Sequence, residues 1–146
     1  MAMPNAEQLN SMLRGFDRLY GLEFVHLSDT EARAQVAVRD ELRQPMGILH
    51  GGVYSSLAES MTSLATAFAV LERGAMALGL SNSTSFLRPI TEGRVHALAT
   101  RLHGGRTTWV WDVRFSDDAD RTCAVTRMTI AVRPLPDGQE PPQRGA

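Results

Sequence analysis

Residues 51–71 read GGVYSSLAESMTSLATAFAVL, and we expect the rest of the chain to pack around them. Their large apolar residues recur every three, four or seven positions, which is the period of an α-helix. Alanines fill most of the remaining positions, so the helix is expected to be apolar nearly all round and buried. A narrower polar stripe is expected along one side, comprising Ser55, Glu59, Thr62, Ser63 and Thr66.

Glu59 is the only charged residue in this stretch. A carboxylate in the middle of a buried helix is costly unless another group pairs with it or the protein uses it. One interpretation is a buried acid satisfied by serine, threonine or arginine. The other is a functional carboxylate that attacks a substrate or activates water.

Gly51 and Gly52 stand where the helix begins. The first amides of a helix have no internal partner and lie at the positive end of its dipole, and glycine lets a ligand approach them closely. This arrangement favours an oxyanion hole. A glycine-rich helix start of no catalytic importance, or a site for any anion, explains the two glycines equally simply.

The composition of the 146 residues excludes several classes of protein. The net charge of −1 does not indicate a nucleic acid or a membrane surface as partner. All 15 basic residues are arginine, which excludes Schiff-base chemistry and favours phosphate recognition. The single cysteine, Cys123, and the lack of a signal peptide predict a reducing, cytoplasmic location. No residues have the spacing of metal ligands, so we expect no metal.

The remaining pattern predicts two strands before the central helix and four after it. A helix buried on several sides needs a strongly curved antiparallel sheet, so we expect an α+β fold. In the first strand, Leu22, Phe24 and His26 are expected to share one face. Residues 1–133 are predicted to form one domain and residues 134–146 a disordered tail. The predicted elements are a surface helix at 5–20, strands at 22–27 and 31–39, a connector at 40–50, and strands at 76–87, 94–103, 107–116 and 121–133.

Residues 44–60, QPMGILHGGVYSSLAES, resemble the hotdog-fold acyl-CoA thioesterases. The hallmark of that family is His-Gly-Gly at the start of a central helix, with an acid a little over two turns further on. The closer resemblance is to the branch with glutamate, which includes 4-hydroxybenzoyl-CoA thioesterases and dihydroxynaphthoyl-CoA hydrolases. Residues 81–89, 107–113 and 131–134 look like the 4-hydroxybenzoyl-CoA type. The resemblance implies a hotdog fold, in which the sheet wraps a long central helix, and hydrolysis of an aromatic acyl-CoA without a cofactor.

The resemblance also implies roles for individual residues. It makes Glu59 the catalytic carboxylate and Gly51 the source of the amide that polarises the thioester carbonyl. Ser63 departs from the 4-hydroxybenzoyl-CoA enzymes, which carry threonine there, and matches the naphthoyl-CoA branch. The other implied site residues are Gln44 as an assisting glutamine, His50 beside the glycines, and Arg88, Arg106 and Thr107 as contacts to the CoA phosphates. Taken alone, His50 is equally a helix cap, and each arginine a surface residue.

Glu59 lies about 12 Å along the helix axis from Gly51, at about 1.5 Å per residue, so one thioester should not reach both within one subunit. The resemblance implies a homodimer, assembling into a homotetramer, with the active site between subunits. The identity of the acyl group is not predicted. It depends on the shape of the pocket, which is set by helix residues such as Tyr54, Ala58 and Met61 and by sheet side chains. The alternatives are a dihydroxynaphthoyl-CoA or broad-range acyl-CoA hydrolase, a hotdog dehydratase, and a non-catalytic acyl-CoA-binding protein.

Overall fold

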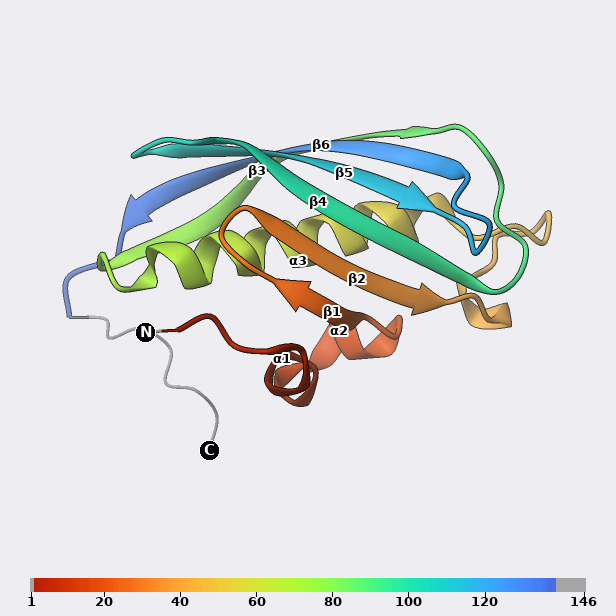
Figure 1. Cartoon of the computed structure of the whole chain (residues 1–146), viewed down its shortest axis with the longest axis horizontal. Helices are drawn as coiled ribbons and strands as arrows, with labels where there is room; N and C mark the ends of the chain where they lie inside the picture. The colour runs from red at the N-terminus through yellow and green to blue at the C-terminus, as the bar shows by residue number, and fades with distance from the viewer. Residues whose placement is uncertain (1, 139–146) are drawn as a thin grey trace.

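The computed structural model describes residues 2–138 and has the expected hotdog architecture. A curved six-stranded antiparallel sheet covers the long helix α3 (Gly51–Leu71) (Figure 1). The strand order is β1-β2-β4-β5-β6-β3, so β1 and β3 form the two edges. The predicted strands agree with the observed ones to within one or two residues. Their bounds are β1 (Glu23–Leu27), β2 (Glu31–Ala37), β3 (Ala75–Phe86), β4 (Arg94–Gly104), β5 (Thr108–Ser116) and β6 (Thr122–Pro134).

The N-terminal segment forms two short helices instead of the single helix predicted over residues 5–20. They are α1 (Ala6–Met12) and α2 (Gly15–Leu19), and a 3-10 turn η1 (Asp40–Leu42) follows β2. The break between them occurs because Leu13 and Arg14 are extended and Gly15 has a φ of +55°. The hydroxyl of the buried Tyr20 then hydrogen bonds with Asp17 at 3.2 Å and with Ser60 of α3 at 3.1 Å, which attaches α2 to the central helix.

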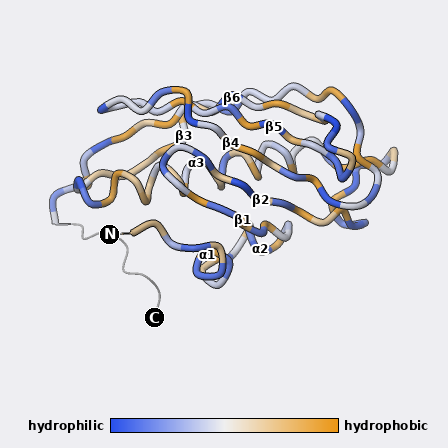
Figure 2. The backbone as a smooth tube through the Cα atoms, in the orientation of Figure 1, coloured by the Kyte–Doolittle hydropathy of each residue, from blue (hydrophilic) through white to orange (hydrophobic). Residues whose placement is uncertain are grey.

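The core lies between α3 and the inner face of the sheet. Figure 2 shows hydrophobic positions recurring along α3 and the strands that cover it. In β5 the buried hydrophobic residues are every second one, namely Trp109, Trp111, Val113 and Phe115. This alternation places one face of the sheet on the helix and leaves the other face outward. Within residues 2–138, none of the helices combines the length and hydrophobicity needed to span a bilayer.

Two predictions about which residues share a face of a strand or helix were wrong. A register shift between Phe24 and His26 in β1 turns His26 outward and Leu27 into the core. The polar stripe of α3 divides, because Thr62 and Thr66 are completely buried. Each of these hydroxyls donates a hydrogen bond of 2.8 Å to the backbone carbonyl four residues earlier. The Thr66 hydroxyl also accepts a hydrogen bond of 3.0 Å from Trp111 Nε1. Only the remaining residues of the stripe reach the surface beside β3.

Strand β3 is the exposed edge of the sheet. Leu80 is 60% exposed and Phe86 58% exposed, although both are large and apolar. At the other end of the chain, Pro134 belongs to β6 and the Leu135 N–H donates to the Gly74 carbonyl at 2.9 Å. The predicted disordered tail therefore includes one residue of a strand, and its residues 139–146 lie outside the described part.

Candidate active site

The start of α3 presents an unused backbone amide. His50 is the N-cap, and its Nδ1 accepts a hydrogen bond of 2.9 Å from the Gly52 N–H. The Val53 N–H donates to the His50 carbonyl at 3.0 Å. Within the described residues the Gly51 N–H has no partner, so the positive end of the helix presents this amide to a ligand.

His50 caps the helix through one ring nitrogen, and the other ring nitrogen remains able to donate a hydrogen bond. Because its Nδ1 accepts from the backbone, the neutral ring carries its proton on Nε2. The side chain is exposed, and the Nε2–H forms no hydrogen bond within residues 2–138. This N–H is therefore available beside the glycines.

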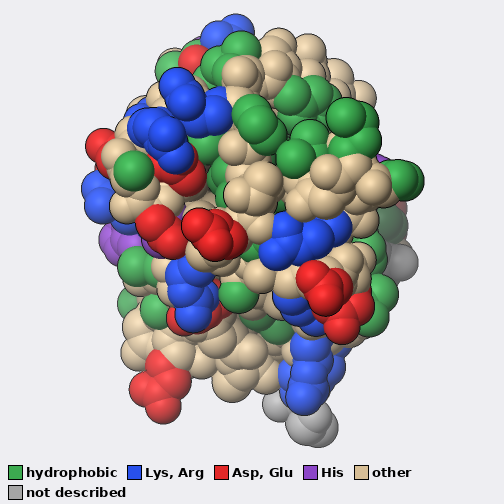
Figure 3. Space-filling view, turned by 90° about the vertical axis from the view of Figure 1, so that its right-hand side faces the viewer, with side chains coloured by type: hydrophobic (Ala, Val, Ile, Leu, Met, Phe, Trp, Pro, Cys, Tyr) green, Lys and Arg blue, Asp and Glu red, His purple; other side chains and the backbone are tan. Residues whose placement is uncertain are grey.

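An open pocket of about 460 Å³ lies beside Gly51. Its walls come from the connector before α3, the first turn of α3, and the end of β3 with the loop that follows. Figure 3 views this end of the molecule and shows hydrophobic side chains gathered at the upper right, with arginine and acidic side chains to the left of them and below. The lining is mostly apolar, which suits an acyl group. It consists of Gln44, Ile48, Leu49, Gly51, Tyr54, Phe86, Leu87, Arg88, Pro89 and Cys123.

Aromatic rings form the wall of the pocket next to Gly51. The rings of Tyr54 and Phe86 meet edge to face, with centroids 5.9 Å apart. A Cβ on Gly51 would lie 2.8 Å from Phe86 Cζ, so glycine is needed for the ring to lie against the helix start. Burial raises the pKa of the Cys123 thiol, which therefore stays protonated at neutral pH and is a poor nucleophile.

Gln44 is held so that its amide group can donate. Its side-chain oxygen accepts a hydrogen bond from the Met46 N–H, and its backbone N–H donates to the Ile48 carbonyl at 2.9 Å. The NH₂ group of Gln44 is thus left for a ligand in the pocket. The structure brings Gln44, His50, Gly51 and Arg88 together at the N-terminal end of α3.

Glu59 lies further along α3, against strand β3. Its Oε1 accepts a hydrogen bond of 3.1 Å from the Ser63 hydroxyl, so the two predicted site residues are in contact. The side chain is half-buried, and within the described residues it forms no ion pair. Of the partners named by the alternative interpretation, Glu59 has a serine, Ser63, and within the described residues it has no arginine of its own subunit. The carboxylate is available to act on a substrate.

Gly79 of β3 makes room for this carboxylate. A Cβ at position 79 would lie only 2.2 Å from Glu59 Oε1. The strand is held at this distance by side chains further along it. Asn82 Nδ2 donates to the Ser55 carbonyl at 2.8 Å, and the Ser55 hydroxyl donates to Thr84 Oγ1 at 3.3 Å. Asn82 and Thr84 of β3 thus attach the edge strand to the helix face that carries Glu59.

The residues predicted to contact the CoA phosphates lie at different ends of the subunit. Arg88 lines the pocket at the N-terminal end of α3. Arg106 and Thr107 belong to the β4–β5 turn, whose neighbours Gly104 and Trp109 line a hollow with Phe68 and Arg73 at the C-terminal end of α3. Figure 1 shows the β4–β5 turn and the β3–β4 loop at opposite ends of the sheet. One subunit does not bring Arg88 and Arg106 together.

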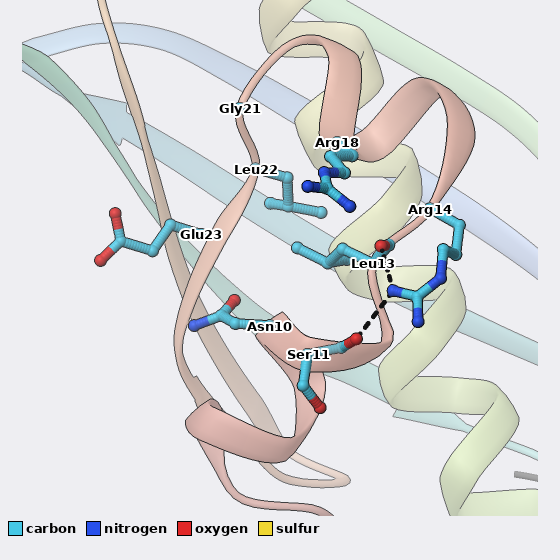
Figure 4. Close-up of a pocket in the computed structure, with 8 residues that line it drawn as sticks. All are labelled: Asn10, Ser11, Leu13, Arg14, Arg18, Gly21, Leu22 and Glu23. Atoms are coloured by element: carbon cyan, nitrogen blue, oxygen red, sulfur yellow. Dashed lines mark hydrogen bonds between the residues drawn. The ribbon is translucent and has the colours of Figure 1, made fainter. Parts of the chain in front are cut away.

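A further hollow lies between α1, α2 and β1 and shares no residue with the pocket (Figure 4). Arg14 and Arg18 both border it. The Arg14 guanidinium donates to the Ser11 and Leu13 carbonyls, each at 2.8 Å, so it holds the turn between the two helices together. This hollow contains none of the predicted site residues.

Comparison with known proteins identifies the family. Residues 46–124 match the thioesterase superfamily. The chain belongs to this superfamily. A mutant of thioesterase PA1618 from Pseudomonas aeruginosa has the same fold with a TM-score of 0.86, at 38% identity over 92% of this chain and 97% of that one. Thioesterase HI1161 from Haemophilus influenzae also has a TM-score of 0.86, at 31% identity, covering 94% of this chain and 97% of its own.

The 1,4-dihydroxy-2-naphthoyl-CoA hydrolase of Listeria monocytogenes is 33% identical over 119 residues, which are 82% of this chain and 96% of that protein. With the structural neighbours, this relative shows that the chain is a thioester hydrolase. The predicted family and reaction class are therefore confirmed.

Sequence reasoning missed two residues that shape the site of this thioesterase. Gly79 and Phe86 are brought to α3 by the pairing of β3 with β6. A glycine inside a strand pattern is a signal of close approach, so Gly79 could have been noticed. Tyr54 lines the pocket as predicted, whereas Ala58 and Met61 are completely buried in the core.

Proposed function

We propose that this thioesterase hydrolyses an aromatic acyl-CoA of the 4-hydroxybenzoyl type to the free acid and CoA. The observation that carries the proposal is Glu59, a half-buried carboxylate that bonds only to the Ser63 hydroxyl and pairs with no cation in the described residues. The aromatic wall of the pocket beside Gly51 supports an aromatic acyl group.

In this mechanism the Gly51 N–H stabilises the negative charge on the thioester oxygen, assisted by the Gln44 amide. Glu59 takes a proton from water, which attacks the acyl carbon, and the proton then passes to the departing CoA sulfur. Alternatively Glu59 attacks directly, and water cleaves the resulting mixed anhydride. The proposal needs no metal or redox cofactor. Among residues 2–138, no three His, Cys, Asp or Glu side chains gather where they could hold a metal ion.

We propose that the site is completed by a second subunit. Eight residues separate Gly51 from Glu59, or about 12 Å along the helix axis, which is too far for one thioester to meet both. The exposed edge of β3, with the apolar Leu78 and Leu80, suits pairing with a second copy. Such a homodimer would bring Glu59 of one subunit opposite Gly51 of the other.

A pair of such dimers would supply the nucleotide site. Arg88 and Arg106 lie at opposite ends of one subunit, so both reach one CoA only if they come from different subunits. We also propose that the dimers assemble into a homotetramer, located in the cytoplasm, in which Arg88, Arg106 and Thr107 from different subunits bind CoA phosphates.

A dihydroxynaphthoyl-CoA hydrolase is the second candidate. Ser63, rather than threonine, supports it, as does the relative of that name from Listeria monocytogenes. Ranking kcat/KM over benzoyl-, hydroxybenzoyl-, dihydroxynaphthoyl- and hexanoyl-CoA distinguishes the two. A preference for the two-ring substrate would replace the first candidate, and a preference for hexanoyl-CoA would reject both.

The catalytic role of Glu59 is tested by Glu59→Gln, which keeps the shape and removes the charge. We expect kcat for thiol release to fall by about 10³-fold, within the range for loss of a general base. Glu92→Gln, at an exposed carboxylate in the β3–β4 loop, is the control and should leave kcat unchanged. Unchanged turnover in Glu59→Gln would refute the mechanism.

A further inference from the structure

The two tyrosines of this chain are equally buried but differ in their hydroxyl groups. Tyr20 and Tyr54 are each 3% exposed. The Tyr20 hydroxyl hydrogen bonds with Asp17 and Ser60. The Tyr54 hydroxyl has no hydrogen-bond partner within the described residues. The hydroxyl of a well-buried tyrosine usually has a hydrogen-bond partner, so the unpaired Tyr54 hydroxyl calls for a functional explanation.

The Tyr54 side chain lines the pocket beside Gly51, and its hydroxyl is not fully enclosed. Within residues 2–138, every side-chain nitrogen or oxygen that is fully enclosed has a hydrogen-bond partner. Since the Tyr54 hydroxyl has none, it is not fully enclosed. Tyr54 is also one of the residues that line the pocket beside Gly51.

The Tyr54 ring is fixed in position. Its edge-to-face neighbours are Phe86, with centroids 5.9 Å apart, and Phe115, with centroids 5.2 Å apart. A ring packed against two others loses little further freedom when a ligand binds. Burial raises the pKa of Tyr54 to about 12, so the phenol stays protonated and can donate at neutral pH.

Tyr54 contributes a hydroxyl donor to the wall of the pocket where aromatic rings pack. Phe86 and Cys123 both line the pocket and both interact with Tyr54, and the thiol is a weak hydrogen-bonding group. Arg88 and Gln44 are the long polar side chains of the lining, and the mechanism assigns both to the CoA thioester. The acyl group therefore meets aromatic surface and one phenol.

We propose that Tyr54 is a specificity-determining residue that selects aromatic acyl groups carrying a ring hydroxyl over unsubstituted ones. This inference rests on the proposed function, since it assumes that the acyl group occupies the pocket beside Gly51. The Tyr54 phenol donates a hydrogen bond to the ring hydroxyl of the substrate, and an unsubstituted ring has no oxygen to accept it. One neutral hydrogen bond of this kind corresponds to discrimination of about tenfold.

The test is Tyr54→Phe, which removes only the hydroxyl. Thiol release is measured for benzoyl-CoA and for its 2-, 3- and 4-hydroxy derivatives. The wild type should prefer at least one hydroxylated substrate by about tenfold in kcat/KM, and Tyr54→Phe should abolish this preference with benzoyl-CoA changed less than about twofold. The matched control is Tyr20→Phe, which removes the other buried hydroxyl outside the pocket and should leave the preference intact.

An unchanged preference in Tyr54→Phe, or an equal loss with all four substrates, would overturn the inference while leaving the hydrolase intact. No thiol release from any substrate by the wild type would instead refute the proposed function. A binding measurement separates failure of the inference from failure of the proposed function. Calorimetric titration with non-hydrolysable thioether analogues should show about tenfold weaker binding of the hydroxylated analogue to Tyr54→Phe, and equal binding to both proteins would also overturn the inference.

Discussion

Replacing Gly79 by alanine should inactivate the enzyme without unfolding it. The new Cβ would lie 2.2 Å from Glu59 Oε1, whereas ordinary contact begins at 3.4 Å, so the carboxylate must retreat by about 1.2 Å. The obstacle is the end of a flexible side chain, and the carboxylate can move aside. Gly79 does not require a positive φ, so alanine fits the strand backbone. We therefore expect the free energy of unfolding to change by less than about 1 kcal/mol.

The effect on catalysis should be much larger. A displacement of about 1 Å at a reacting group costs about 100-fold in rate, which corresponds to about 2.7 kcal/mol in the activation barrier. The same movement also strains the 3.1 Å hydrogen bond from Ser63. We expect kcat to fall about 100-fold and KM to change less than about threefold, because the pocket beside Gly51 is untouched.

The assay is steady-state thiol release with the substrate that the acyl-CoA panel selects. Urea unfolding and light scattering after size-exclusion chromatography show whether stability and oligomeric state are preserved. Ser83→Ala, an exposed change further along β3, is the control and should behave as the wild type. A kcat for Gly79→Ala within about threefold of the wild type, with assembly intact, would refute the placement of Glu59 as the reacting group.

Three further changes test other parts of the structure. Gly51→Ala would place a Cβ 2.8 Å from the Phe86 ring, which must then move toward the pocket; kcat/KM should fall about tenfold or more, and an unchanged value would contradict the role of this helix start. Thr66→Val removes the buried acceptor of Trp111 Nε1 and should lower the free energy of unfolding by about 1–3 kcal/mol in urea, with kcat retained. Burial raises the pKa of Tyr20, so above about pH 10 the unfolded state loses this proton before the folded state, and the free energy of unfolding should fall as pH rises. Tyr20→Phe should show a shallower fall in the free energy of unfolding between about pH 9 and 11, and parallel pH curves for the two proteins would contradict this expectation.

Local patterns were sufficient to predict the elements of this fold. The helical period of residues 51–71 and the turn residues between the strands gave the order and ends of α3 and β3–β6 to within two residues. These signals are local because a side chain's neighbours within a helix or strand are fixed by the backbone geometry of that element. For the same reason, the contact between Glu59 and Ser63 followed from their spacing of four residues on one helix.

Contacts between distant segments required the tertiary structure. Which helix-start amide is free depends on the side chain of His50, which uses Gly52 and leaves Gly51. The position of Gly79 against Glu59 depends on how β3 is attached to α3. The pairing register of a sheet and its bulges set such contacts, and residues far away in the chain determine that register. The sequence by itself therefore determined the fold and the position of one acid, Glu59, within its central helix, while only the packing of β3 on α3 decided the surroundings of that acid and of the pocket beside Gly51.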